Sequence, residues 1–324
     1  MNASPLLDLP GMQEDLARLE PCLREAVTSG DAFLDQVSTH LIDAGGKRLR
    51  PALALAAATC GEGGSGDDDM QGAVAVELVH LASLYHDDVM DEASLRRNVE
   101  SVNARWGNLV AIVAGDFLLA RSAEIAAALG TEIAGLLANT LGRLCQGQLS
   151  EVRTAYDTRR TEDQYFDTVA GKTAALMSTS CRIGAITGNR PRAEVDALSS
   201  FGRALGFLFQ LRDDLLDVVA GDEELGKQSG QDLAEGIYTL PVILALRDNS
   251  VGPELEALLG KPLGQPEREK AKAMVGSSTA IAGTLSRAEH LATEATEAAE
   301  GLAPRPLAQA MAGLARNLLV DLRT

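Results

Sequence analysis

The sequence predicts an all-α protein built as a single helical bundle. Segments rich in Ala, Leu and Glu repeat their apolar residues with a period near 3.6, which is typical of amphipathic helices. The alternation of β-branched residues expected of strands is almost absent. No Gly- or Pro-rich stretch is long or biased enough to link two domains, so we expect one domain over residues 1–324.

Each expected helix is an apolar-periodic segment that ends at a Gly, Pro or polar break. The clearest breaks are residues 61–69, 188–191, 221–236 and 260–266. The expected helices are residues 12–28, 31–44, 50–60, 70–91, 107–129, 131–154, 162–188, 193–219, 238–248, 267–274, 278–301 and 305–321.

Composition limits the protein class. A chain of 324 residues with 46% apolar and 23% charged residues can bury a large core. Residues 1–12 lack the basic and apolar regions of a secretory signal, and we expect no transmembrane segment because no apolar run approaches the roughly 18 residues required. The four cysteines lack CxxC spacing, which favours reduced thiols and a cytoplasmic location. They are Cys22, Cys60, Cys145 and Cys181.

The net charge of −17 has two consequences for partners. It repels a nucleic-acid backbone at long range, so we expect no nucleic-acid partner. It also repels any other anionic substrate. Such a substrate would have to be captured locally by metal ions and a few well-placed cations.

Two copies of one acidic signature are the strongest functional signal. Each follows an apolar run and places three carboxylates within about one helical turn, because positions i and i+4 share a face. Such clusters suit magnesium, which prefers oxygen ligands and shares its shell with substrate phosphates. The alternative is an acidic helix end that faces solvent. The residues are Asp87, Asp88 and Asp91 in the first triple, and Asp213, Asp214 and Asp217 in the second.

Two basic segments supply candidate anion ligands. Residues 45–51 read Gly-Gly-Lys-Arg-Leu-Arg-Pro, which places three cations at the expected start of a helix, where backbone N–H groups favour anions. Arg96 and Arg97 follow the first acidic triple. Taken alone, the first segment would fit a solvated basic loop better than an anion site, and the second would fit a surface ion pair.

Together these motifs resemble the trans-isoprenyl diphosphate synthases. The resemblance covers about residues 40–245 and also includes Glu-Leu-Val-His at 77–80, Gly-Asp-Phe-Leu at 115–118, Gly-Lys-Thr-Ala at 171–174, Phe-Gln-Leu-Arg at 209–212 and Thr-Leu-Pro at 239–241. It implies a helical bundle of the isoprenoid synthase type, with a central cavity between the two acidic motifs, and a homodimer. The implied reaction joins isopentenyl diphosphate to an allylic diphosphate primer with Mg²⁺.

The resemblance also implies residue roles. Magnesium would be held by Asp87, Asp88 and Asp91 on one wall and by Asp213, Asp214 and Asp217 on the other. The diphosphate of isopentenyl diphosphate would bind Lys47, Arg50, His80 and Arg97. The allylic diphosphate would bind Arg96, Lys172, Thr173, Gln210 and Lys227. For His80 and Gln210 the alternative is a hydrogen-bonded polar residue of the core.

One region departs from the family pattern. Gln231 and Ile237 stand where related enzymes commonly carry lysines, before the Thr-Leu-Pro motif. The loss of one cation near a diphosphate weakens binding by about 1 to 3 kcal/mol where nothing replaces it. Closure over the allylic site is therefore in question, although Lys227 is retained.

The residues before the first acidic triple bear on product length. Helical spacing puts Ala82 and Ser83 one turn, and Leu78 and Val79 two turns, before Asp87, where they would line the tunnel for the growing chain. Short-chain relatives carry a blocking aromatic residue there. The small side chains predict a product longer than twenty carbons, such as a quinone side-chain precursor.

Three alternatives stay open. A bulky neighbour such as Phe117 or Met177 could supply a tunnel floor and give a farnesyl or geranylgeranyl product. A non-catalytic subunit of a heteromeric synthase would be expected to have lost acidic ligands, yet all six are present. A class I terpene cyclase would lack the basic segment at residues 45–51.

Overall fold

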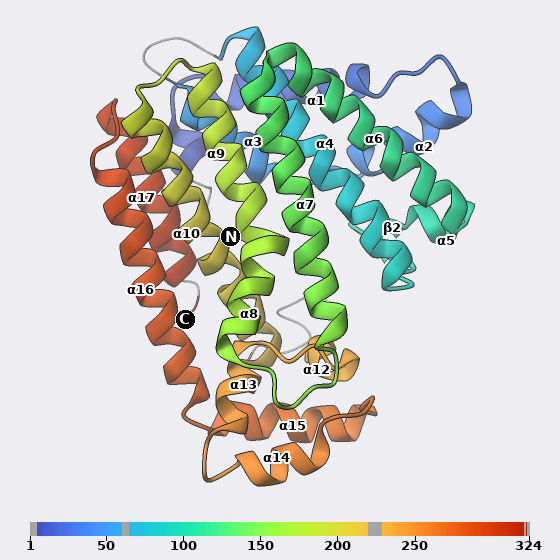
Figure 1. Cartoon of the computed structure of the whole chain (residues 1–324), viewed down its shortest axis with the longest axis vertical. Coiled ribbons are helices and arrows are strands. Elements are labelled where there is room, and N and C mark those ends of the chain that lie inside the picture. Colours follow the sequence, from blue (N-terminus) through green and yellow to red (C-terminus); the bar gives the residue numbers. More distant parts are fainter. Residues whose placement is uncertain (1–4, 60–64, 220–228, 321, 323–324) are drawn as a thin grey trace. The chain divides into compact units, whose positions relative to one another are not determined.

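The computed structural model describes residues 5–59, 65–219, 229–320 and 322. The all-α prediction is confirmed, and strands in this part are limited to one short hairpin (Figure 1). The α-helices are α1 (Met12–Ala26), α2 (Ala32–Asp43), α3 (Leu49–Ala58), α4 (Asp67–Met90), α5 (Val102–Trp106), α6 (Asn108–Leu129), α7 (Thr131–Arg153), α8 (Glu162–Val169), α9 (Ala175–Thr187), α10 (Arg192–Val219), α12 (Gln231–Glu235), α13 (Leu240–Leu246), α14 (Gly252–Leu258), α15 (Gln265–Ser277), α16 (Ala280–Glu300) and α17 (Arg305–Val320). A 3₁₀ turn η1 (Pro5–Asp8), a π-helical turn η2 (Ala170–Ala174) and the strands β1 (Leu95–Arg96) and β2 (Val99–Glu100) complete the described elements.

The chain divides into two compact units. Unit 1 comprises Met1–Leu141, Leu176–Gly202 and Gly301–Met311, and unit 2 comprises Gly142–Ala175, Arg203–Glu300 and Ala312–Thr324. The unit boundaries fall inside α7, α10 and α17, at the start of α9 and at the end of α16. The single domain expected over residues 1–324 stays a prediction.

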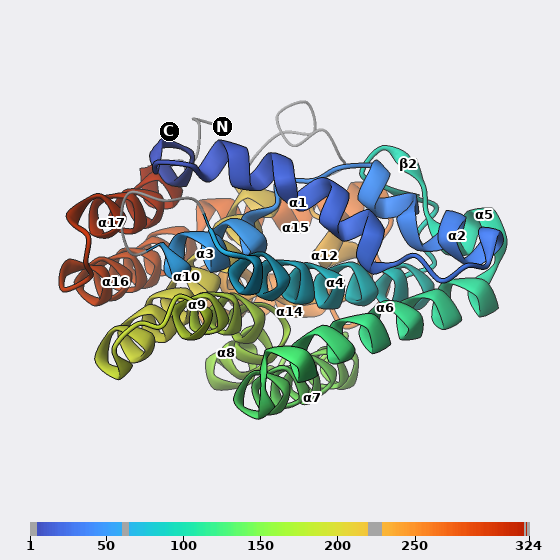
Figure 2. The same ribbon diagram turned by 90° about the horizontal axis from the view of Figure 1, so that it is seen from above.

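Helix α4 is the centre of unit 1. It runs beside α6, and α1 and α3 pack on it (Figure 2). Its middle, from Gly72 to Val79, is buried on every side, which is the burial expected of a helix whose apolar residues are not confined to one face. Three aspartates occupy its first turn, where the helix dipole favours negative charge. Its last turn carries Asp87 and Asp88.

A short β-hairpin, with two residues in each strand, follows α4. Strand β1 pairs antiparallel with β2, with Leu95 opposite Glu100 and Arg96 opposite Val99. The two turn residues, Arg97 and Asn98, have φ of 55° and 64°, as a type I′ turn requires. The sequence analysis did not predict this hairpin, because strands of two residues are too short to show alternation.

Unit 2 contains a break that periodicity missed. The single helix expected over residues 162–188 is divided into α8, η2 and α9. The π turn contains Gly171, which lies against α7: a Cβ on Gly171 would meet the carbonyl oxygen of Arg143 at 2.6 Å, and a Cβ on Gly147 would meet the backbone nitrogen of Lys172 at 2.5 Å. An extra residue in one turn leaves the apolar pattern on both sides almost unchanged, so the sequence shows no signal for it.

The remaining differences are small. The helices α5, α12 and α14 have five, five and seven residues and were not predicted, because they are shorter than the window in which periodicity is visible. In unit 2, α13 packs on α16, and α14 and α15 pack on each other. Among the described residues, no helix combines the length and the apolar character needed to span a membrane.

The close crossing at Gly147 gives a test of the packing. Gly147→Ala should lower the free energy of unfolding by about 1 to 3 kcal/mol, because the new methyl group would overlap the backbone at Lys172. Gly142→Ala in the same helix is the matched control, since a Cβ there meets nothing within 4 Å. The control should raise stability by up to about 1 kcal/mol through helix propensity. Equal effects of the two substitutions on urea denaturation would contradict the crossing.

Candidate functional site

The glycine pair at residues 45 and 46 allows an arginine to lie on the backbone of unit 1. Gly45 and Gly46 have φ of 78° and 147°, values that suit glycine. A Cβ on Gly46 would lie 2.8 Å from Cζ of Arg97. Any larger residue at position 46 would therefore displace the Arg97 guanidinium.

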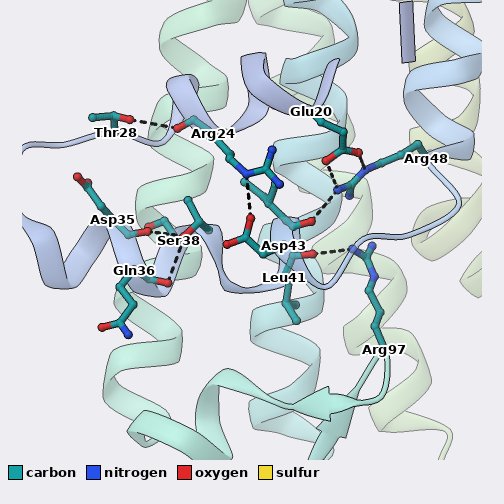
Figure 3. Close-up of polar contacts among 12 residues, drawn as sticks. Glu20, Arg24, Thr28, Asp35, Gln36, Ser38, Leu41, Asp43, Arg48 and Arg97 are labelled. Carbon is teal, nitrogen blue, oxygen red and sulfur yellow. Dashed lines mark hydrogen bonds and ion pairs between the residues drawn. The ribbon is translucent and has the colours of Figure 1, made fainter. Parts of the chain in front are cut away.

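Arg97 is held on this loop from the tip of the hairpin (Figure 3). Its Nη1 donates to the carbonyl oxygen of Leu41 at 2.9 Å and also to that of Gly45. Its own backbone is in the left-handed region, which is costly for a residue with a side chain. The fold thus holds the guanidinium beside the loop that carries Lys47.

The three cations of the segment at residues 45–51 have different environments. Arg48 is buried and links several elements. It donates to both carboxylate oxygens of Glu20 at 2.7 and 3.0 Å (Figure 3). It also donates to Glu77 at 2.9 Å and to the carbonyl oxygen of Ile42 at 3.0 Å. Lys47 is exposed. Arg50 Nε is buried and has no hydrogen-bond partner among the described residues.

A single buried carboxylate lies at the centre of these cations. Glu77 is 1% exposed. Burial raises the pKa of Glu77, while Arg48, Arg50 and Arg97 lower it. Burial lowers the pKa of Arg50, against the opposing effect of Glu77. Positive charge is in local excess, so this part of unit 1 is suited to an anion.

His80 lies on α4 one turn after Glu77. Burial, and then the charges of Arg50 and Arg97, hold the pKa of His80 well below its usual value. The imidazole is therefore neutral at physiological pH, and it can donate or accept a hydrogen bond without adding charge.

The first acidic triple lies at the end of α4 in unit 1. Asp88 is fully buried, and its Oδ1 accepts from Nε and Nη2 of Arg96 at 2.7 and 2.5 Å. Burial raises the pKa of Asp88 and Arg96 lowers it. Oδ2 of Asp88 is buried without a hydrogen-bond partner in the described part of the chain. Asp91 is exposed at the helix end, and its N–H donates to the carbonyl oxygen of Asp87 at 2.8 Å.

The second acidic triple lies on α10 in unit 2. Asp213 is exposed, whereas Asp214 and Asp217 are 2% and 5% exposed. Asp214 accepts from Oη of Tyr165 at 2.5 Å and from Nε2 of Gln210 at 2.8 Å. Burial raises the pKa of Asp214 to about 7, against the lowering effect of these two hydrogen bonds.

The π turn brings two further predicted ligands to this region of unit 2. Thr173 Oγ1 donates to Oε1 of Gln210 at 2.8 Å, which joins the turn to α10. Lys172 Nζ forms a salt bridge with Glu151 of α7. Sequence reasoning missed Tyr165 and Glu151, since neither belongs to a short motif. Lys227 lies outside the described residues.

The six predicted metal ligands are all aspartates. Across the described ranges no three His, Cys, Asp or Glu side chains are grouped so that they could hold a metal by themselves. Each triple nevertheless offers carboxylate oxygens, which suit magnesium when substrate phosphates supply further ligands. One carboxylate oxygen of the first triple, the buried Oδ2 of Asp88, has no hydrogen-bond partner among the described residues.

Two expectations about the cavity stay predictions. Leu78, Val79 and Ala82 are buried in unit 1, and Ser83 is partly exposed with its hydroxyl donating to the carbonyl oxygen of His80 at 2.8 Å. Their role as a tunnel lining is untested. The two acidic triples lie in different units, and the expectation that they face each other is untested as well.

The helical fold and these two groups of carboxylates and cations define an isoprenoid-synthase-type protein. Residues 31–276 match the family described as Polyprenyl synthetase, and the chain belongs to this family. The family resemblance stated from the sequence is thus confirmed, and the chain is a prenyltransferase. The individual roles of the site residues stay predictions.

Three relatives illustrate the range of the family. A nonaprenyl diphosphate synthase of Mycobacterium tuberculosis is 38% identical over 251 residues, covering 76% of this chain and 74% of that protein. A decaprenyl diphosphate synthase from Rhodobacter capsulatus has a solved structure with a TM-score of 0.89 and 35% identity, covering 97% and 98% of the two chains. A geranylgeranyl pyrophosphate synthase from Corynebacterium glutamicum was solved with calcium and isoprenyl diphosphate. Its structure has a TM-score of 0.85 and 35% identity to this chain, covering 96% of each of the two chains.

The buried carboxylate of Glu77 gives a second test. Glu77→Gln should lower the free energy of unfolding by about 3 kcal/mol, because loss of one partner leaves the buried guanidinium of Arg48 without its buried counter-charge. Glu20→Gln removes the other carboxylate partner of Arg48, but Glu20 is 33% exposed and its loss should cost about 1 kcal/mol or less. Urea denaturation measures both. A larger loss for Glu20→Gln would show that Glu77 is not the main counter-charge.

Proposed function

We propose that this chain joins isopentenyl diphosphate to an allylic diphosphate and makes an all-trans polyprenyl diphosphate longer than twenty carbons. The observation that carries this proposal is that each of the two units has its own group of carboxylates and polar or cationic side chains. Unit 1 has an arginine cluster around Glu77 beside the first acidic triple, and unit 2 has Lys172 and Gln210 beside the second. Two diphosphates need two such groups.

In this proposal the cluster of unit 1 binds isopentenyl diphosphate. Lys47, Arg50 and Arg97 supply charge, and neutral His80 supplies a hydrogen bond. Arg48 does not contact the substrate, because its guanidinium is already bound to Glu20 and Glu77. Its role is to keep the loop at residues 45–51 in place.

In the same proposal, Lys172, Thr173 and Gln210 of unit 2 bind the allylic diphosphate. Lys172 exchanges its salt bridge with Glu151 for the leaving diphosphate, so its charge meets the negative charge that develops there. Magnesium, when bound to the aspartates of the two triples, supplies the same stabilisation as a Lewis acid.

The reaction then needs no nucleophilic side chain. The allylic carbon–oxygen bond breaks and leaves an allylic cation, which the double bond of isopentenyl diphosphate attacks to form the new carbon–carbon bond. A proton is lost from the adduct, and the released diphosphate is its acceptor. The fixed guanidinium groups of Arg96 and Arg97 hold charge near the reactants without reorganising.

Product length is the finer part of the proposal. Ala82 and Ser83 leave room beyond the first acidic triple, and two of the three relatives described above make nonaprenyl and decaprenyl products. The geranylgeranyl synthase of Corynebacterium glutamicum is as similar in identity as the decaprenyl enzyme, and it supports a twenty-carbon product as the second candidate.

We also propose that the protein is a homodimer. Helix α6 carries large apolar residues on its surface: Leu109 and Val113 are 76% and 53% exposed. A second copy covering this face would bury them. Light scattering that gives the mass of one chain would contradict the dimer.

The free thiols of Cys22, Cys145 and Cys181 support a cytoplasmic location, which cell fractionation would test.

A direct assay tests the reaction. The purified chain alone, incubated with magnesium, labelled isopentenyl diphosphate and allylic primers of several lengths, should give products longer than twenty carbons after dephosphorylation. Asp87→Ala and Asp213→Ala should each abolish turnover, because each removes a carboxylate that binds metal. Circular dichroism should show that both variants remain folded.

Each outcome of this assay has a clear meaning. Products that stop at twenty carbons would overturn the long-chain proposal and leave the prenyltransferase intact. No elongation by the chain alone would overturn the proposed reaction and favour a subunit that requires a partner. Full turnover by Asp87→Ala would remove that residue from the metal site.

A further inference from the structure

A continuous hydrogen-bonded path connects three elements of unit 2. It begins at Thr173 in the π turn, passes through Gln210 and Asp214 on α10, and ends at Tyr165 on α8. Its three contacts measure 2.8, 2.8 and 2.5 Å. Both oxygens of the Asp214 carboxylate accept a hydrogen bond on this path. The rotation of the carboxylate is therefore fixed from two sides.

The phenol of Tyr165 is itself held in one place. Tyr165 is 2% exposed, and its ring makes an edge contact with Phe166 at 5.3 Å between centroids. The guanidinium of Arg160 lies 5.8 Å from the same ring. Arg160 is fixed in turn by hydrogen bonds to the carbonyl oxygen of Tyr238 at 3.0 Å and to Thr168 at 2.9 Å. The Tyr165 hydroxyl and the Asp214 carboxylate that accepts its hydrogen bond are therefore both held in fixed positions.

The hydrogen-bonded path supplies the donors that the buried carboxylate of Asp214 needs. Asp214 is 2% exposed, and Asp213 and Asp217 lie on the same helix within one turn of it. A buried carboxylate beside other carboxylates is repelled by them and needs donors to hold it. Gln210 supplies one donor, and its own amide orientation is set by Thr173. Tyr165 supplies the other, and it does so without adding a positive charge that would compete with a metal.

We propose that Tyr165 is a positioning residue of the allylic site. Its hydroxyl sets the orientation of Asp214, and through Gln210 it aligns the second acidic triple with the diphosphate ligands of the π turn. This inference rests on the proposed function. It assigns Tyr165 no contact with the substrate. Because the path lies wholly in unit 2, removal of the Tyr165 hydroxyl should affect the allylic site and leave isopentenyl diphosphate binding unchanged.

The test removes the hydroxyl and keeps the ring. Tyr165→Phe is compared with wild type and with Tyr238→Phe, a matched control in unit 2. Tyr238 is also fully buried, and its hydroxyl accepts from the N–H of Gly260 at 2.6 Å, away from the acidic triple. Calorimetry with an unreactive allylic thiodiphosphate in excess magnesium measures binding, and steady-state assays measure KM for magnesium and for each substrate.

Tyr165→Phe should weaken binding of the thiodiphosphate about tenfold and raise KM for magnesium by a similar factor, as expected for one hydrogen bond to a charged group. KM for isopentenyl diphosphate should be unchanged. Tyr238→Phe should match wild type in binding and in KM, while its thermal stability should fall by an amount similar to that of Tyr165→Phe. This split separates positioning from packing.

Two results would overturn the inference. If Tyr165→Phe binds the thiodiphosphate as wild type does while wild type elongates primers, the hydroxyl has no positioning role and the proposed function stands. If both tyrosine variants weaken binding equally, the effect is one of packing. Wild type that neither binds the thiodiphosphate with magnesium nor elongates would overturn the proposed function, and this inference with it.

Discussion

The contact between Arg48 and the buried carboxylate of Glu77 is the constraint on which the cation cluster of unit 1 depends. Arg48 ties the loop after α2 to α1 and to α4 through Glu20, Ile42 and Glu77. A buried ion pair of this kind adds little net stability, but loss of one partner is costly. Its effect here is positional. With Arg48 neutralised inside the protein, the charges of Lys47, Arg50 and Arg97 remain in excess for a ligand.

Unit 2 solves a similar problem with neutral donors. Its central buried carboxylate, Asp214, is held by a phenol and an amide in place of a guanidinium. The nearest cation of the π turn, Lys172, is instead engaged by Glu151. The two units therefore treat their carboxylates differently: Glu77 pairs with a guanidinium inside a cation cluster, whereas Asp214 is held by two neutral donors.

The sequence predicted the long helices and the two charged clusters because both are repeated patterns. Apolar residues at a period of 3.6 located α4 and α10, and the i, i+4 spacing of Asp87 and Asp91 is kept at the end of α4. The contacts of Tyr165 and Glu151 could not be predicted, since each depends on how α8 and α7 pack beside residues distant in sequence. The burial of Arg48 beside exposed Lys47 was equally hidden, because adjacent cations look alike in a sequence.

Two of the places where periodicity failed, the π turn and the hairpin after α4, carry predicted ligands. The π turn inserts one residue into the helix expected over residues 162–188 and carries Lys172 and Thr173. The hairpin after α4 holds Arg97 in a left-handed conformation on the backbone of Gly46. Both distortions cost free energy that regular helix or extended backbone would not. A ligand-binding residue often needs a direction that the regular element does not offer. In this protein the glycines at positions 46, 147 and 171 supply the space that makes those directions possible.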